Sequence, residues 1–288
     1  MNSNKRLIRY GTALLAVLLC FAVFIVIMNI ARDVYKQPAI ASGEDAESNI
    51  VNQFLAVAVM FFMGLLLLLP FKNRLGMTQT MLLAYLVGLL TFDFISILLL
   101  SFHIYYALSS IFIVYCVLAA VMYGFFLRKQ SRANALDKED GIKLIFWTVV
   151  ILAAGYTLSR VPLSILSYDS IQYDLLGKVY ASEHYYVEYA YYLMGGQMLV
   201  PTLLNTAAGL FGFSFAYALQ NMFTLSGTLL FGYLLYAGVR MGGMVKKRSL
   251  WTAILGTLLL ASGFFYVFLG ITLVPNILAG LEILFMMV

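Results

Sequence analysis

The stretch VNQFLAVAVMFFMGLLLLLPF, from Val51 to Phe71, decides the fold class of this chain. It carries no charged residue and has the length that a helix needs to cross the hydrocarbon layer of a bilayer, about 20 apolar residues. A second run, MTQTMLLAYLVGLLTFDFISILLL from Met77 to Leu100, follows a short basic connector and contains a single acid, Asp93. The two runs predict two consecutive membrane spans.

The composition agrees with an integral membrane protein. Of the 288 residues, 63% are hydrophobic and 11% are charged, whereas a soluble domain is about half apolar and a quarter charged. The net charge of +5 does not indicate nucleic acid as a partner, because basic residues in such proteins mark cytoplasmic loops. The cysteines Cys20 and Cys116 fall inside predicted spans, without disulfide or metal-ligand spacing. We therefore predict an all-α, polytopic transmembrane helical bundle.

Seven spans are predicted, the first as an uncleaved signal anchor. They are Leu7–Ile30, Val51–Phe71, Met77–Leu100, Tyr105–Leu127, Ile142–Val161, Phe213–Val239 and Leu250–Ile271. With a cytoplasmic N-terminus, most of the 18 Lys and Arg residues lie inside, as the positive-inside rule requires. This sidedness holds only if Met198–Gly212, which contains Pro201, is re-entrant or lies on the surface of the membrane.

The spans suggest two regions. Residues 1–141 form a four-span region, and residues 142–288 a second membrane region with an outer-face loop at 162–212, which contains short helices. The apolar run after Pro275 is too short for a full span, so we expect the sequence to stop within an eighth one.

A polar segment, SILSYDSIQYDLLGKVYASEHYYVEYAYYLMGGQ from Ser164 to Gln197, interrupts the apolar pattern on the predicted outer face. Asp169 comes just after the fifth span. Its position suits the N-cap of a helix at Ile171–Tyr180, and it equally suits a general base that deprotonates an acceptor hydroxyl. The two roles are compatible.

Further candidates for substrate binding follow in the same segment. Tyr173 shares a helical face with Asp169, while Asp174 either lies on a solvated face or pairs with Asp169 for acid–base work or a divalent cation. His184 and Glu188 stand at i, i+4, a spacing that fits a loop hydrogen bond as well as a binding site. The eight tyrosines between Tyr168 and Tyr192 suit a membrane-interface belt, and one or two of them would suit stacking on a sugar.

Three other charged residues have a structural and a functional interpretation. Arg160, near the outer end of the fifth span, either snorkels to the headgroups or grips a lipid phosphate, for which Lys178 is a second candidate. Asp93 lies within the third span, with Thr91 and Ser96 close in sequence. It must find partners or stay protonated, and its role is either helix packing or a proton or ion path.

The segment SYDSIQYDLLG, Ser167–Gly177, resembles the first outer loop of GT-C-type integral membrane glycosyltransferases. Many of these carry an Asp just after a span, in a stretch like D-S-x-x-Y-H-L, and Asp169-Ser170-Ile171-Gln172-Tyr173-Asp174-Leu175 is similar, with Asp174 where His is frequent. In that family the loop usually follows the first span, whereas here it follows the fifth predicted span. The similarity extends over about Ile142–Val288.

This resemblance implies sugar transfer from a polyprenyl-phosphate-linked donor to an acceptor on the outer face of a bacterial cytoplasmic membrane, with Asp169 as the catalytic base. The transferred group would be a hexosyl or pentosyl unit, the partners would be membrane lipid and the polyprenyl-phosphate-linked sugar, and a divalent cation would be an optional cofactor. Two alternatives stay open. Asp93 and a half-helix at Met198–Gly212 would suit a transporter or flippase, and a non-catalytic membrane subunit would need neither.

Overall fold

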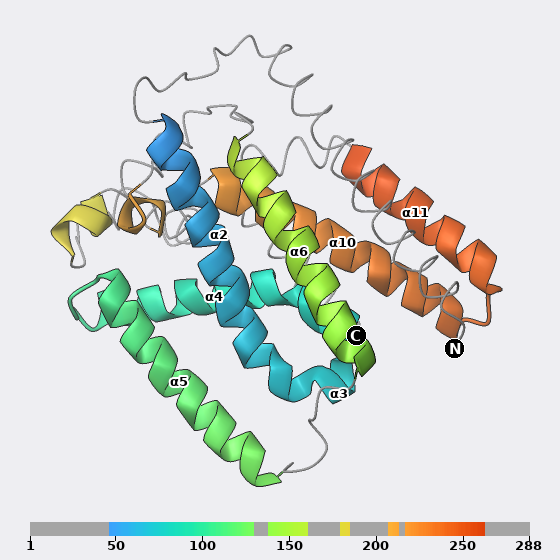
Figure 1. The fold of residues 1–288 in the computed structure, drawn as a ribbon, viewed down its shortest axis with the longest axis horizontal. Coiled ribbons are helices and arrows are strands. Elements are labelled where there is room, and N and C mark those ends of the chain that lie inside the picture. Colours follow the sequence, from blue (N-terminus) through green and yellow to red (C-terminus); the bar gives the residue numbers. More distant parts are fainter. Residues whose placement is uncertain (1–45, 130–137, 161–178, 185–206, 213–216, 263–288) are drawn as a thin grey trace.

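The computed structural model describes residues 46–129, 138–160, 179–184, 207–212 and 217–262, and every regular element in these ranges is helical (Figure 1). The predicted all-α class is therefore confirmed. Short helical segments lie at 179–183 and 207–210. The longer elements are α2 (Ala46–Leu68), the 3₁₀ turn η1 (Leu69–Phe71), α3 (Lys72–Leu75), α4 (Met77–Ser101), α5 (Leu108–Lys129), α6 (Lys138–Arg160), α10 (Tyr217–Met241) and α11 (Lys246–Ser262).

Four helical stretches within the described ranges are long and apolar enough to cross a membrane. They are Ile50–Leu75, Met77–Ser101, Lys138–Ser159 and Asn221–Met241, and α5 adds a shorter apolar stretch at Leu108–Gly124. The first three and the stretch on α5 agree with predicted spans to within four residues, whereas Asn221–Met241 begins eight residues after the predicted Phe213. The first predicted span, Leu7–Ile30, and the end of the seventh lie outside the described residues.

The outer surface of these helices is apolar, as a lipid environment requires. On α5, Ile113, Val117 and Val121 are each at least 60% exposed and recur every four residues, so they form one continuous stripe. On α6, Ile145 and Val149 are similarly exposed. Such stripes would be an aggregation hazard in water, whereas in a bilayer the acyl chains cover them. The structure thus has the surface of an integral membrane protein.

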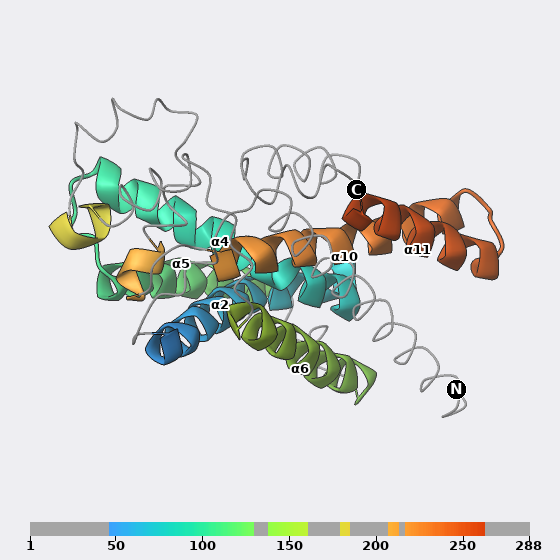
Figure 2. The same cartoon turned by 90° about the horizontal axis from the view of Figure 1, so that it is seen from above.

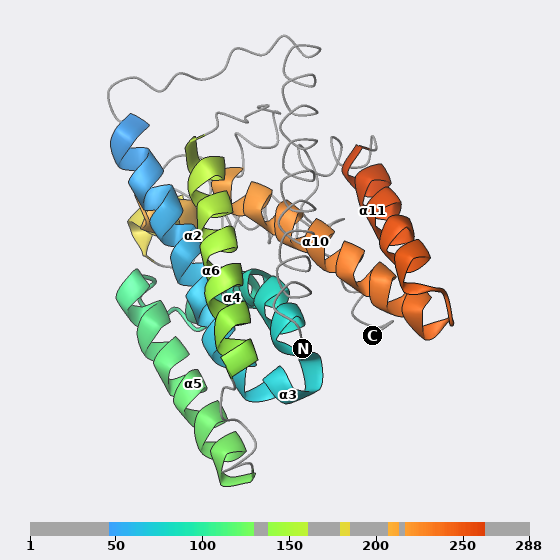
Figure 3. The same cartoon turned by 45° about the vertical axis from the view of Figure 1, so that its right-hand side comes forward.

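The central helix of this group is α4, which packs against α2, α6 and α10 (Figures 1 and 3). Its sequence is apolar on all sides, a pattern typical of a helix that is buried all round. The crossing with α2 brings backbone against backbone. A Cβ added at Gly64 would collide with the Ala84 carbonyl oxygen, and one added at Gly88 would collide with the Met60 carbonyl oxygen. Small residues at four-residue spacing permit this approach.

Pro70 ends α2 and explains one contact of α5. A proline lacks the N–H group that would otherwise bond to the carbonyl four residues earlier, which here is the carbonyl of Leu66. The Tyr123 hydroxyl of α5 donates to the Leu66 carbonyl oxygen at 2.8 Å. A second tyrosine, Tyr115, donates to the Met63 carbonyl oxygen at 2.8 Å. Side-chain hydroxyls therefore tether α5 to the backbone of α2.

An ion pair joins α3 to the start of α6. The Lys72 Nζ lies 2.8 Å from an Asp140 carboxylate oxygen, and the Lys72 side chain is only 4% exposed. Asp140 stands in the first turn of α6, where the helix dipole favours a carboxylate. We call this end of the helices the Lys72 end, and the opposite end, where α4 turns into α5, the α4–α5 end.

The last two described helices form a pair at one side of the group (Figure 2). α10 packs on α4 and α6, and α11 packs on α10. The two helices meet closely, because Gly232 of α10 faces Thr257 of α11 and Gly256 faces Leu235. α10 begins near the middle of α4, where the Tyr85 hydroxyl donates to the Leu219 carbonyl oxygen at 2.9 Å.

Candidate functional site

The first feature of the site is a carboxyl group buried inside the helices. Asp93 of α4 is 5% exposed. Among the described residues, neither of its carboxyl oxygens has a hydrogen-bond partner. It lies eight residues before the end of α4, which is about 12 Å along the helix axis. A buried polar group without a partner is rare in proteins and marks a place to look for function.

The two hydroxyls that the sequence places near Asp93 bond elsewhere. The Thr91 hydroxyl donates to the Val87 carbonyl oxygen at 2.7 Å, and the Ser96 hydroxyl donates to the Phe92 carbonyl oxygen at 2.8 Å. Both are the i−4 bonds that serine and threonine commonly make within helices. The partners expected from sequence therefore do not satisfy Asp93.

Tyr106, in the turn between α4 and α5, is the second feature. Its side chain is fully buried, and its hydroxyl donates to the Ser96 oxygen at 3.1 Å. Burial raises the pKa of the Tyr106 phenol well above its usual value; the hydrogen bond to Ser96 opposes this shift, and the nearby Asp93 adds to it. Ser96 stands three residues after Asp93 on the same helical face. The phenol and the carboxyl group thus belong to one buried polar cluster.

His184 connects this cluster to the polar segment. The Tyr106 N–H donates to the His184 carbonyl oxygen at 2.7 Å, and the His184 Nδ1 lies 2.8 Å from the Tyr106 carbonyl oxygen. Because a carbonyl can only accept, Nδ1 must carry a proton in this arrangement. The His184 ring also lies against Tyr105, with ring centroids 4.7 Å apart. His184 therefore makes a loop hydrogen bond and anchors segment 179–184 at the α4–α5 end.

The backbone of His184 is held in an uncommon conformation. Its φ of 61° lies in the left-handed region, where histidine is found more often than most residues. The two hydrogen bonds to Tyr106 stabilise this conformation. Tyr180, four residues earlier, is buried in the core beneath it.

Most of the other predicted site residues fall outside the described ranges. These are Asp169, Tyr173, Asp174, Lys178 and Glu188, together with the first part of Met198–Gly212. Arg160 is the last residue of α6, and its side chain is not described. Of the predicted candidates, the structure brings His184 into contact with the helices, through a residue that the sequence did not single out. A tyrosine at the start of a span is typical of the membrane interface, so the residue pattern provided no reason to choose Tyr106 as a site residue.

The end of Met198–Gly212 packs against α4. Ala207 and Ala208 are fully buried, and the Phe211 ring lies 6.2 Å from the ring of Phe92, centroid to centroid. Phe92 directly precedes Asp93. The chain entering α10 therefore covers the part of α4 that carries the carboxyl group.

The described residues offer no cage for a divalent cation. None of them forms a group of three or more His, Cys, Asp or Glu side chains that could hold a metal ion. The predicted pair Asp169 and Asp174 lies outside the described ranges. The proposed transfer mechanism therefore assigns no role to a metal ion.

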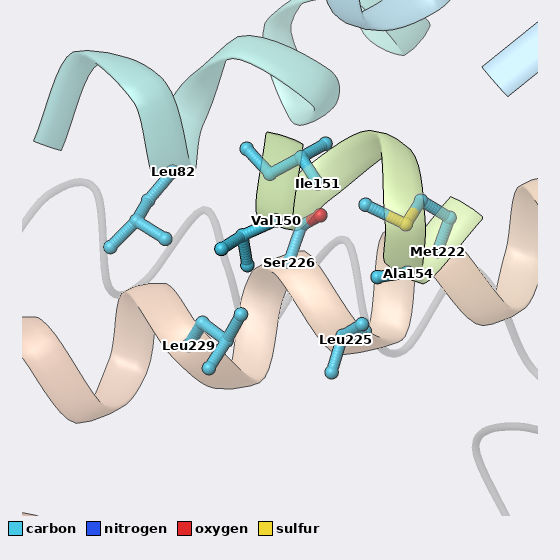
Figure 4. A pocket seen from close by; sticks show the side chains of 8 residues that line it. All are labelled: Leu82, Val150, Ile151, Ala154, Met222, Leu225, Ser226 and Leu229. Atoms are coloured by element: carbon cyan, nitrogen blue, oxygen red, sulfur yellow. The ribbon is translucent and has the colours of Figure 1, made fainter. Parts of the chain in front are cut away.

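A narrow apolar pocket lies between α4, α6 and α10 (Figure 4). It holds about 10 Å³, roughly the space of one water molecule. Side chains from three helices line it: Leu82, Val150, Ile151, Ala154, Met222, Leu225, Ser226 and Leu229. Seven of the eight are apolar, and the Ser226 hydroxyl is the single polar group on its wall. Such a lining suits a hydrocarbon rather than a polar ligand.

The chain matches none of the protein-family models, curated proteins or solved structures with which it was compared.

Proposed function

We propose that the chain belongs to a membrane glycosyltransferase that moves a sugar from a polyprenyl-phosphate donor to an acceptor hydroxyl at the α4–α5 end. The resemblance of Asp169–Leu175 to the loop of GT-C-type transferases is the reason to consider this chemistry. The observation that supports it is the apolar pocket between α4, α6 and α10, because a polyprenyl donor needs a hydrocarbon-lined site close to its phosphate.

The position of the pocket suits such a donor. Ala154 lines it from α6, and Arg160 ends the same helix six residues later, about 9 Å along the axis. A donor with its first isoprene unit beside Ala154 would carry its phosphate near the end of α6. A guanidinium there would bind the phosphate oxygens in a forked geometry. Because the pocket is narrow, α6 and α10 must separate slightly to admit the chain.

The proposed reaction is an inverting displacement. Asp169 removes the proton of the acceptor hydroxyl, whose oxygen then attacks the anomeric carbon of the sugar. The bond between that carbon and the phosphate oxygen breaks, and the polyprenyl phosphate leaves. Arg160 or Lys178 stabilises the negative charge that develops on the leaving phosphate.

The test uses the full-length protein in liposomes with polyprenyl-phosphate sugars. Ala154→Phe fills the pocket, so we expect the KM for the donor to rise about tenfold or more, since blocking an apolar contact costs about 1–3 kcal/mol. Ala153→Phe is the matched control, because Ala153 is the neighbouring residue and is exposed. Equal effects of the two changes would remove the pocket from the proposal.

Asp169→Asn tests the chemistry separately. Asparagine caps a helix as well as aspartate does, so folding should persist, while turnover should fall about a hundredfold or more through loss of the general base. A folded Asp169→Asn protein with normal turnover would leave Asp169 as a helix cap and would contradict the proposed mechanism.

A further inference from the structure

Asp93 is buried, no described residue supplies a counter-charge to it, and the transfer chemistry proposed above does not use it. Burial penalises the ionised form of a carboxyl group and hardly affects the neutral form, so the surroundings of Asp93 favour a bound proton. We propose that Asp93, Ser96 and Tyr106 form a buried proton-binding site, and that release of the proton loosens the contact between Tyr106 and His184.

Among the described residues, no Lys or Arg side chain bonds to Asp93. The closest ionisable groups are the hydroxyls of Tyr85, on α4 itself, and Tyr106, both of which sense the charge of Asp93. Residues 50–68 of α2 and 219–230 of α10 contain no ionisable side chain. The other described ionisable groups around this end of the helices are His103, Tyr115, Cys116 and Tyr156, together with Glu183 and His184 of segment 179–184. Of these, His184 bonds to the backbone of Tyr106.

Glu183 is exposed and lies next to His184 at the α4–α5 end. The charged side chains described on α3 and α6 belong to the Lys72 end. The ion pair of Lys72 and Asp140 lies there, about 24 Å along α4 from Asp93 by the sixteen residues between Met77 and Asp93. Arg240 lies in the last turn of α10, about 32 Å along the helix from Leu219, which accepts the bond from Tyr85 of α4. None of these charges is placed to pair with Asp93.

The ligand is a proton rather than a metal ion because the described residues form no group of three or more His, Cys, Asp or Glu side chains that could hold a metal ion. The Tyr106 hydroxyl donates to Ser96, and the Ser96 hydroxyl donates to the Phe92 carbonyl oxygen. A metal ion would need several free oxygens around the carboxylate, whereas a proton needs only the carboxyl group. The raised pKa of Tyr106 keeps its own proton on the phenol, so Asp93 is the group of the cluster that exchanges one.

Loss of the proton would leave a buried charge that requires water or a hydrogen-bond donor. The turn that carries Tyr106 closes the α4–α5 end over this position, and it is held by the two hydrogen bonds with His184 and by the stacking of Tyr105. Parting of these contacts would admit water to Asp93. Ionisation therefore favours the open arrangement, and protonation favours the closed one seen here.

Infrared difference spectroscopy of the full chain in lipid nanodiscs tests the site. At neutral pH we expect the carbonyl band of a protonated carboxyl group, lost in Asp93→Asn and retained in Asp140→Asn, because Asp140 pairs with Lys72 as a carboxylate. A band of unchanged intensity in Asp93→Asn would overturn the assignment. If Asp93→Asn does not fold, Asp93→Glu must shift the band, and an unshifted band would overturn it equally.

Spin labels test the opening. Phe102 and Ser182 are both exposed, one on each side of the contact; they are replaced by cysteine in a Cys20→Ser, Cys116→Ser background. We expect the distance between the labels to increase as the pH rises, and to stay short in Asp93→Asn, which mimics the neutral acid. An increase of equal size in Asp93→Asn would refute the coupling. Neither readout involves sugar transfer, so their failure is distinguishable from that of the proposed function.

Discussion

Among the described residues, two side chains of charged residue types are buried, Lys72 and Asp93, and they differ in their partners. At the Lys72 end, the Lys72 side chain is 4% exposed and lies 2.8 Å from the Asp140 carboxylate. Towards the α4–α5 end, Asp93 is 5% exposed, and no described residue bonds to its carboxyl oxygens. Both groups have lost their hydration, so the difference lies in the counter-charge. The Lys72 end therefore holds a permanent charge, whereas Asp93, towards the α4–α5 end, becomes charged only when its surroundings change.

Removing the counter-charge of Lys72 should have the largest effect. Asp140→Asn removes the carboxylate that lies 2.8 Å from the buried Lys72 ammonium, so we expect the free energy of unfolding to fall by about 3–5 kcal/mol. Denaturant titration in detergent micelles measures this loss. A loss below about 1 kcal/mol would mean that water reaches Lys72 and that the two ends do not differ in the way described.

Replacing Asp93 should have the opposite sign. Asp93→Val removes an unsatisfied buried group and is close to it in shape, so we expect stability to rise by about 1–2 kcal/mol, within the usual penalty for such a group. Asp93→Asn keeps a polar group there and should change stability by less. The same titration measures both variants. If Asp93→Val were as damaging as Asp140→Asn, Asp93 would have a charged partner, and the comparison would fail.

Tyr106→Phe should have a smaller effect. It removes the hydrogen bond to Ser96, whose hydroxyl still donates to Phe92, so no buried donor is left unpaired. We expect a loss of about 0.5–1.5 kcal/mol, the usual net value of one hydrogen bond. Tyr115→Phe, which removes a bond of similar length to Met63, is the matched control. A much larger loss at Tyr106 alone would show that its hydroxyl also stabilises Asp93 directly.

The smallest effect is expected from the second ion pair of α6. Lys143 lies 3.0 Å from Glu139 at i, i+4, and both side chains are partly exposed. Glu139→Gln should reduce stability by about 0.3–0.5 kcal/mol at low salt, and the difference should vanish near 1 M salt, where screening acts over about 3 Å. Asp140→Asn should keep its effect in high salt. Loss of both effects in salt would place Lys72 in contact with solvent.

The helices could be predicted from the sequence because the bilayer imposes a length and a polarity on each of them. The boundaries could not. α2 begins at Ala46 rather than Val51, since polar residues can continue a helix outside the hydrocarbon layer. α5 begins at Leu108 rather than Tyr105, because the backbone of Tyr106 bonds to a residue 78 positions away. Hydropathy contains no information on such a contact.

The site could be predicted only in part. A lone acid in a span is unusual enough for Asp93 to be noticed, and its isolation could not be foreseen, because Thr91 and Ser96 were suitable partners by spacing. Both hydroxyls bond to carbonyls of their own helix instead. The transfer site predicted around Asp169 stays a prediction, since that residue lies outside the described ranges.

The contact between Gly64 and Gly88 has a consequence for how the protein is made. Both glycines lie between residues 46 and 101, so this backbone-to-backbone crossing joins helices that are neighbours in sequence. Contacts of such short sequence separation form fast, because little chain entropy is lost in closing them. The α2–α4 hairpin can therefore assemble in the membrane while the ribosome is still synthesising α6 and α10. The later helices are then added to a surface that already exists, and a side chain at either glycine would stop assembly at its first step.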